Sequence, residues 1–345
     1  MKFLLTLLGV LLFTACQKEQ ITVNDHASDT FYVDNANAAM RVLVQGNTAS
    51  RVFVLFVHGG PGGSAYGYST DYVQQHLETK YACVYWDQRN AGAAQGNANV
   101  ANLNLPQMTE DLKKVIQVLK ARYGQDARVF LLGHSFGGLL TASFLTTGTY
   151  QALVNGWIVV DGDHNYPLND SLTRNMLLMM GQQQLLLRNH PAEWQPIVDY
   201  CQAHPGNFTF EESTQLNTYA HEAETYFEEV KKVDVLAILR QGAIRYDVPV
   251  TTLFLNSRFS NNAAFNRELA KTEFTSVLAK VTTPTLLLYG KYDFICPSGM
   301  GEDIFNHVGT PHKRLAVSPI SGHNPYIQDE SFFCNEINQF VEQYK

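Results

Sequence analysis

The stretch from residue 129 to residue 145 constrains the fold most, because a buried strand, a tight turn and a helix follow one another within it. The apolar run VFLL (129–132) leads into GHSFG (133–137), and helix-forming residues follow. In so sharp a turn, side chains at the two glycine positions would collide with the neighbouring strand and helix. A Gly-x-Ser-x-Gly pattern between a strand and a helix predicts that Ser135 is an exposed nucleophile.

The same alternation of strands and helices extends over much of the chain. Almost unbroken apolar runs at 51–57 and 82–86 predict strands that are buried on both faces. An amphipathic pattern at 108–123 predicts a helix, and Gly124 is expected to end it. Further strands are expected at 31–33, 40–44, 157–160, 285–289 and 314–317. This alternation predicts an α/β fold in which helices flank a mostly parallel central sheet.

Residues 165–275 interrupt the alternation. Gln, Asn, Glu and Leu dominate this segment, and it has no pattern of alternating strands and helices. We interpret the segment as a helical cap that is inserted into a core formed by residues 31–164 and 276–345. Cap helices are expected at 176–188, 192–201, 211–230, 234–246 and 263–278.

The first residues have the pattern of an export signal. Lys2 supplies a positive charge, and a mainly apolar run follows over 3–13. This run is too short to cross a bilayer, which takes about 20 residues, but it suits a signal peptide. Because Cys16 follows small residues, the segment resembles a bacterial lipobox, which predicts a lipoprotein signal peptide over 1–15, lipidation of Cys16 and a polar tether over 16–30. We expect an exported, membrane-anchored lipoprotein in the periplasm or at the cell surface; ordinary cleavage with an incidental cysteine is the alternative.

The composition excludes several classes of function. The 345 residues carry a net charge of −7 without a basic cluster, which argues against nucleic-acid binding. Neither C-x-x-C nor H-E-x-x-H occurs, so we predict no metal and no cofactor. Besides Cys16, four cysteines are scattered along the chain, and Cys296 with Cys334 is the disulfide that we consider, although a sequence does not determine pairing. A small molecule or a short peptide is the expected substrate.

Polar residues gather at the predicted carboxyl ends of the strands, where parallel sheets concentrate their chemistry. A serine nucleophile needs a base, and the base needs a group that orients it. His323 lies in a loop after the last predicted strand and is our candidate base. Asp293 follows a buried strand directly and is our candidate for the orienting acid of the Ser135 site. Asp161 and Asp163 also follow a strand and stay open as alternative acids.

Acyl transfer also needs hydrogen-bond donors for the oxyanion of the tetrahedral intermediate. The backbone amides of Gly60 and Phe136 are our candidates, and His58 is expected to orient the loop that contains Gly60. Residues 60–65 also fit a dinucleotide-binding fingerprint, with Asp87 at the end of the next strand. We disfavour that alternative, because no amphipathic helix follows these glycines and because it leaves the serine, histidine and aspartate candidates unexplained.

Taken together, these motifs resemble the α/β-hydrolase superfamily. The motifs are HGGPG (58–62), DQR (87–89), GHSFG (133–137), the turn at Asp293 and the loop at His323. The chain order Ser, Asp, His is also the order of that superfamily. HGGPG together with DQR resembles, more narrowly, the proline iminopeptidase branch of serine peptidases. The resemblance covers about residues 50–160 and 280–345 and implies hydrolysis through an acyl-enzyme.

The resemblance also implies a substrate class. An aminopeptidase of the proline iminopeptidase type is the first expectation, and a carboxylesterase acting on small acyl esters is the alternative. A non-catalytic surface lipoprotein that binds a ligand is the rival from another class. Members of the peptidase branch hold the free amine of the substrate with cap carboxylates, which implies substrate contacts for Glu222, Glu224 or Glu228, whereas an ordinary solvated helix face is the simpler interpretation.

Overall fold

An eight-stranded sheet forms the centre of the protein. The computed structural model describes residues 21, 23–95, 100–234, 236–238, 240, 246, 248, 256 and 262–345. The strands are β1 (Ala27–Asn35), β2 (Ala38–Gly46), β3 (Val52–Val57), β4 (Ala82–Trp86), β5 (Arg128–His134), β6 (Gly156–Val160), β7 (Thr285–Gly290) and β8 (Lys313–Ser318). Their order in the sheet is β1-β2-β4-β3-β5-β6-β7-β8. Every neighbouring pair from β4 to β8 is parallel, which confirms the predicted fold class.

The first two strands form an antiparallel hairpin, and both are longer than predicted. Ala36 and Asn37 form its turn with positive φ angles. β1 begins at Ala27, which pairs with Gly46. The last four residues of the predicted tether (16–30) therefore belong to this strand. The predicted signal peptide and Cys16 lie outside the described residues, and export and lipidation stay predictions.

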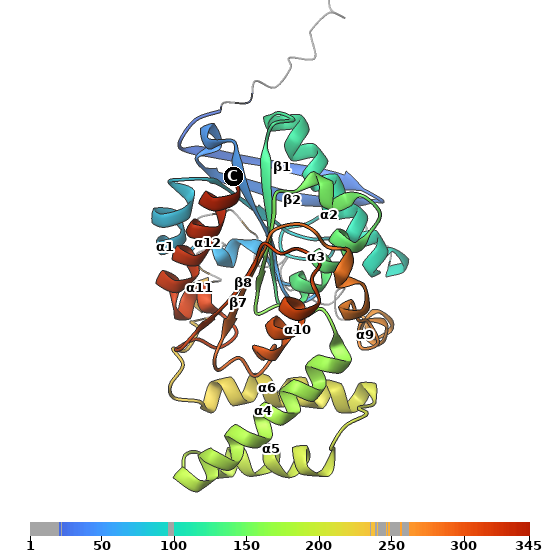
Figure 1. The fold of residues 1–345 in the computed structure, drawn as a ribbon, viewed down its shortest axis with the longest axis vertical. Helices are drawn as coiled ribbons and strands as arrows, with labels where there is room; N and C mark the ends of the chain where they lie inside the picture. Colours follow the sequence, from blue (N-terminus) through green and yellow to red (C-terminus); the bar gives the residue numbers. More distant parts are fainter. Residues whose placement is uncertain are drawn as a thin grey trace, which may run out of the picture.

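Each strand in the centre of the sheet packs against helices on both of its faces. Phe53 and Leu55 of β3 belong to a core cluster with α2 (Leu105–Tyr123), α3 (Phe136–Thr146) and α10 (Gly299–His307). Val54 and Phe56 of the same strand pack instead with the opposite layer. That layer contains α1 (Asp71–Val73), the π-helical turn Gln74–Glu78, α11 (Pro325–Gln328) and α12 (Glu330–Tyr344) (Figure 1). This two-sided burial explains why the strands are apolar without interruption.

The cap lies between β6 and β7 and extends from the end of the sheet (Figure 1). Its described helices are α4 (Tyr166–Leu187), α5 (Pro191–Ala203), α6 (Phe210–Tyr226) and α9 (Ala263–Leu269). α6 begins with a capping box, in which the Thr209 hydroxyl accepts from the Glu212 amide and the Glu212 carboxylate accepts from the Thr209 amide.

Several predicted helix boundaries in the cap are wrong. α4 begins ten residues before the predicted position, because Asn165 caps it and Pro167 stands in its first turn. α9 ends at Leu269, and a separate 3-10 helix, Thr275–Lys280, follows where one continuous helix was predicted. Most of the helix predicted at 234–246 lies outside the described residues.

The disulfide considered from the sequence is absent. Cys296 and Cys334 are both free and buried, as are the other two described cysteines. Cys296 packs with Phe294 in a hydrophobic cluster that includes Trp194 of the cap. Cys334 of α12 packs in the cluster on one face of the sheet. The two thiols therefore belong to different hydrophobic clusters.

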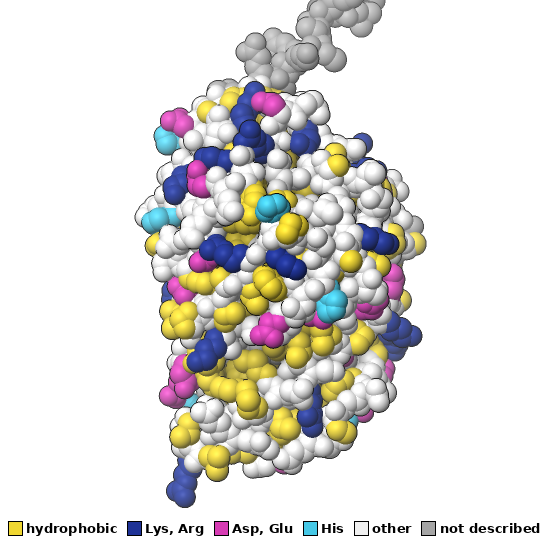
Figure 2. Space-filling model, viewed as in Figure 1, with side chains coloured by type: hydrophobic (Ala, Val, Ile, Leu, Met, Phe, Trp, Pro, Cys, Tyr) yellow, Lys and Arg dark blue, Asp and Glu magenta, His cyan; other side chains and the backbone are white. Residues whose placement is uncertain are grey.

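The outer face of the cap exposes apolar side chains. Met179, Leu186 and Leu187 of α4 are among the most exposed large hydrophobic residues that the structure describes. Figure 2 shows hydrophobic side chains gathered on the lower half of the molecule, where the cap helices lie. Among the described helices, none combines the length and the apolar composition of a membrane-spanning segment.

A buried ion pair joins the sheet to α2. The Arg89 Nη2 atom donates to the Asp111 Oδ1 atom at 2.7 Å, and both side chains are only 1% exposed. The Asn35 side chain donates to the same carboxylate oxygen at 2.8 Å. The arginine of the DQR motif therefore connects the end of β4, the first hairpin and helix α2.

We expect Asp111→Ala to lower the free energy of unfolding by about 3–5 kcal/mol, because it leaves the buried Arg89 guanidinium without its partner. Urea unfolding followed by circular dichroism measures this change. Glu211→Ala is the matched control, since the Glu211 carboxylate is 74% exposed and lies 3.7 Å from Arg267. We expect the control to change stability by about 1 kcal/mol or less. An equal effect of both substitutions would contradict a special role for the buried pair.

Candidate active site

Ser135 lies in the tight turn between β5 and α3. Its φ of 55° and ψ of −125° are strained for a residue with a side chain. A Cβ atom added at Gly137 would lie 2.0 Å from the Val57 carbonyl oxygen, and one at Gly133 would lie 2.4 Å from the Gly137 oxygen. Glycine at these two positions therefore allows the turn that the sequence pattern predicts.

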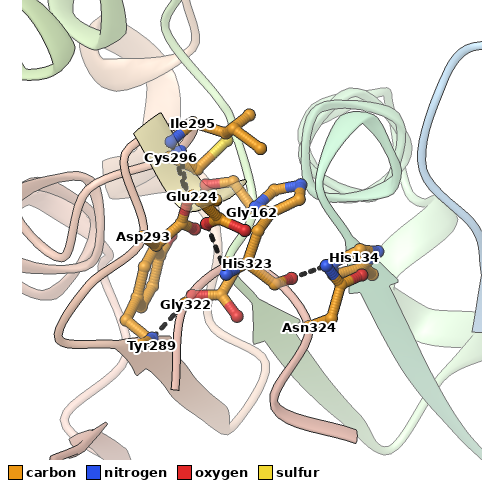
Figure 3. A network of polar contacts seen from close by, with 12 residues as sticks. His134, Gly162, Glu224, Tyr289, Asp293, Ile295, Cys296, Gly322, His323 and Asn324 are labelled. Carbon is orange, nitrogen blue, oxygen red and sulfur yellow. Dashed lines mark hydrogen bonds and ion pairs between the residues drawn. The ribbon is translucent and has the colours of Figure 1, made fainter. Parts of the chain in front are cut away.

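His323 and Asp293 form a buried pair at the carboxyl end of the sheet. The His323 Nδ1 atom lies 2.9 Å from the Asp293 Oδ2 atom. The other carboxylate oxygen of Asp293 accepts from the amides of Ile295 and Cys296, at 2.8 and 2.9 Å (Figure 3). These bonds fix the carboxylate, which in turn holds the imidazole proton on Nδ1. The Nε2 atom of His323 is then the nitrogen that can accept a proton.

The electrostatics of this pair favour a charged imidazole. Burial opposes the charge, but the carboxylates of Asp293 and Glu224 raise the pKa of His323 above its ordinary value. Burial also opposes the ionised form of Asp293, yet His323 holds the pKa of Asp293 below its usual range. The imidazole therefore favours the ionised form of the acid that binds it.

The structure separates the two alternative acids from that role. One Asp161 oxygen accepts from the Gly290 amide at 2.7 Å. Burial and the charge of Asp293 raise the pKa of Asp161 well above its usual range, which disfavours its ionised form. Asp163 lines the cavity next to Ser135 instead of binding His323.

His134 contacts His323 from the other side. Its Nε2 atom lies 2.8 Å from the carbonyl oxygen of His323, and its Nδ1 atom lies 2.7 Å from the hydroxyl of Tyr68. Burial lowers the pKa of His134 to about 3, so this ring is neutral, with Nε2–H donating and Nδ1 accepting. Sequence reasoning missed this contact, since the middle positions of the Gly-x-Ser-x-Gly pattern carry no signal for it.

The loop after β3 packs directly against Ser135. A Cβ atom at Gly59 would lie 2.8 Å from the Ser135 Cβ atom. His58 orients this loop as predicted, because its Nε2 atom accepts from the Gln88 amide at 3.2 Å and its Nδ1 atom donates to the Gly59 oxygen at 2.7 Å. Gly60 lines the same cavity as Ser135.

Asp87 also has a structural role in this loop. Its Oδ1 atom accepts from the Ser64 hydroxyl at 2.7 Å and from the Ala65 amide at 2.9 Å. Its Oδ2 atom accepts from the Ala93 amide at 2.8 Å. Both oxygens are thus occupied by the chain itself, which removes the support for a dinucleotide site at this position.

A cavity of about 390 Å³ lies above Ser135. Its walls combine core loops with cap helices and include Gly60, Tyr66, Ser135, Phe136, Asp163, Tyr166, Asn169, Asn217, His221 and His323. The Asn169 side chain donates to the Ile295 oxygen at 2.9 Å, whereas its own oxygen has no hydrogen-bond partner among the described residues. A buried acceptor of this kind is available to a ligand.

The cap glutamates do not line this cavity. His221 of α6 does, but Glu222, Glu224 and Glu228 are not among its described wall residues. Glu228 is exposed and pairs with His190 at 3.3 Å, so the expected substrate contact is not supported there. Glu224 instead lies behind the base, where its Oε1 atom accepts from the His323 amide at 2.8 Å (Figure 3).

The fold and this arrangement define the class of the protein. The family described as alpha/beta hydrolase fold matches residues 52–330, and the chain belongs to that family.

Named relatives confirm the resemblance to the proline iminopeptidase branch. The chain is 24% identical to the probable aminopeptidase YbaC of Bacillus subtilis over 89% of this chain and 94% of the relative. It is 23% identical to a proline iminopeptidase of Saccharolobus solfataricus over 83% of this chain and 84% of the relative. The solved structure of a proline iminopeptidase from Mycobacterium smegmatis shares the fold, with a TM-score of 0.64 at 17% identity over 92% of this chain and 98% of that chain.

We expect Asp293→Asn to lower the pKa of His323, because the carboxylate that favours the charged imidazole is lost. Nuclear magnetic resonance titration of the histidine rings measures this, with His323→Gln used to assign the signal. Asp303→Asn is the control, since it removes a carboxylate that pairs with His164 at 2.7 Å instead. An unchanged His323 titration in Asp293→Asn would contradict the pairing described above.

Proposed function

We propose that the protein is a serine hydrolase that cleaves an ester or amide bond through an acyl-enzyme. The observation that carries this proposal is the 2.9 Å contact between His323 and Asp293 beside the cavity that contains the strained Ser135. The His323 Nε2 atom takes the hydroxyl proton of Ser135 as the oxygen attacks the carbonyl carbon, and it then gives this proton to the leaving group. Water repeats the two steps and releases the acid.

The amides of Gly60 and Phe136 are the proposed oxyanion donors. Both residues line the cavity together with Ser135, and the Phe136 amide begins the helix that follows the nucleophile. The first amides of a helix have no partner within the helix and favour negative charge, which is what the tetrahedral intermediate carries.

We propose that the protein is an aminopeptidase and that its substrates are short peptides with a free N-terminal amine. The Asp163 amide donates to the Ser135 carbonyl oxygen at 3.1 Å, so this acidic residue lies beside the nucleophile. Burial raises the pKa of Asp163 to about 6, which still leaves the carboxylate mostly ionised at neutral pH. Together with the unpaired oxygen of Asn169, it offers acceptors to the ammonium group of a free N-terminus. The relatives named aminopeptidase and proline iminopeptidase support the same class.

We expect the wild-type protein to cleave proline or alanine anilides and Ser135→Ala to lose this activity by about 10³-fold or more. Anilide and short acyl ester assays measure both reactions, and thermal melting checks that the variant is folded. Cleavage of esters without any anilide cleavage would replace the peptidase proposal by a carboxylesterase. A folded wild-type protein that a fluorophosphonate never labels would favour a non-catalytic binding protein.

We expect Asp163→Asn to raise KM for anilides with a free amine by about 10–100-fold, because a charged hydrogen bond is lost. Short acyl esters without an amine should keep their KM within about twofold. Asp199→Asn, on the solvent side of the cap, is the control and should leave KM unchanged for both kinds of substrate. An equal loss on both substrate types would assign Asp163 a structural role.

A further inference from the structure

The backbone of His323 is held at both of its polar groups. The Glu224 Oε1 atom accepts from its N–H at 2.8 Å, and the His134 ring donates to its carbonyl oxygen at 2.8 Å (Figure 3). His134 belongs to the core, directly before the nucleophile. Glu224 belongs to α6 of the cap and stands 99 positions before His323 in the chain. The backbone of His323 is therefore hydrogen-bonded to the core through His134 and to the cap through Glu224.

The contact with Glu224 is close enough to fix the loop. A Cβ atom added at Gly322 would lie 2.8 Å from the Glu224 Oε1 atom, so glycine is needed for the carboxylate to reach the His323 amide. The Phe294 amide, next to Asp293, also favours the ionised form of the Glu224 carboxylate. One cap side chain thus contacts the loop of the base and the loop of the acid together.

Glu224, near the end of α6, differs from Glu228 in the turn that follows the helix. It is half-buried, whereas the Glu228 side chain is 76% exposed. Burial and the Asp293 carboxylate raise the pKa of Glu224 to about 7. Keeping a carboxylate at such a position requires compensating hydrogen bonds, and the two backbone amides supply them. The ionisable groups that surround it are Asp161, Lys232, Asp293, Cys296, His323 and Tyr326.

We propose that Glu224 is a positioning residue for His323, through which the cap completes the catalytic base. By accepting from the His323 amide, the carboxylate fixes the loop that directs the imidazole toward Asp293. Its charge also favours the imidazolium that forms when Ser135 gives up its proton. This inference rests on the hydrolase function proposed above. It differs from a substrate contact, since Glu224 uses its Oε1 atom within the protein and is not among the described residues that line the cavity.

The test uses the rate at which a fluorophosphonate labels Ser135, because this reagent has no amine and reports the nucleophile and base alone. We expect Glu224→Ala to lower the labelling rate about 10²-fold, as a misplaced catalytic group does. Glu224→Gln keeps an acceptor for the amide, so its rate should recover to within about tenfold of the wild type at its optimal pH. Its rate should also fall off at a lower pH than that of the wild type, because the charge that favours the imidazolium is gone. Glu228→Ala, in the turn that follows α6, is the control and should label like the wild type.

The outcomes separate this inference from the proposed function. If the wild-type protein is not labelled, the hydrolase proposal itself fails. If the wild type is labelled and a folded Glu224→Ala is labelled equally fast, the positioning role is overturned. A normal labelling rate with a raised KM for substrates that carry an amine would make Glu224 a substrate contact instead. If Glu224→Ala does not fold, Glu224→Gln decides: an unchanged pH profile overturns the proposal.

Discussion

The geometry of the site depends on how closely helix α3 approaches the end of strand β3. Gly137 lies so near the Val57 carbonyl that a single added carbon would stand 2.0 Å from its oxygen. This approach brings the loop after β3 against Ser135, and it sets the distance between the nucleophile and the candidate oxyanion donors. Backbone packing, with glycine at a few positions, therefore builds the part of the site in which the carbonyl group of a substrate would react.

The carboxyl groups buried near His323 differ in how strongly their ionised forms are favoured. His323 lowers the pKa of Asp293, whereas burial and Asp293 raise the pKa of Asp161. A second full charge at Asp161 would repel the first in a medium of low dielectric constant. The opposite directions of these two pKa shifts reduce the repulsion between the neighbouring carboxyl groups.

Local patterns in the sequence predicted the sheet, the turn at Ser135 and the candidate acid and base, because each depends on residues that are neighbours along the chain. The start of α4 was missed although Asn165 and Pro167 carry a local capping signal. The bond from Glu224 to His323 could not be predicted in the same way. It joins residues that are far apart in sequence, and a glutamate on a helix looks the same whether it faces solvent or a backbone amide.

Helix α6 carries two kinds of residue that a protein engineer would wish to change separately. Asn217 and His221 form part of the wall that a substrate meets, while Glu224, one turn further along, is bonded to the loop of the base. A redesign that moves this helix to admit a larger substrate would displace His323, the proposed base, as well. Under the proposed function, substrate selectivity and reaction rate are coupled through α6. Directed evolution of either property would then have to exchange side chains and leave the helix axis in place.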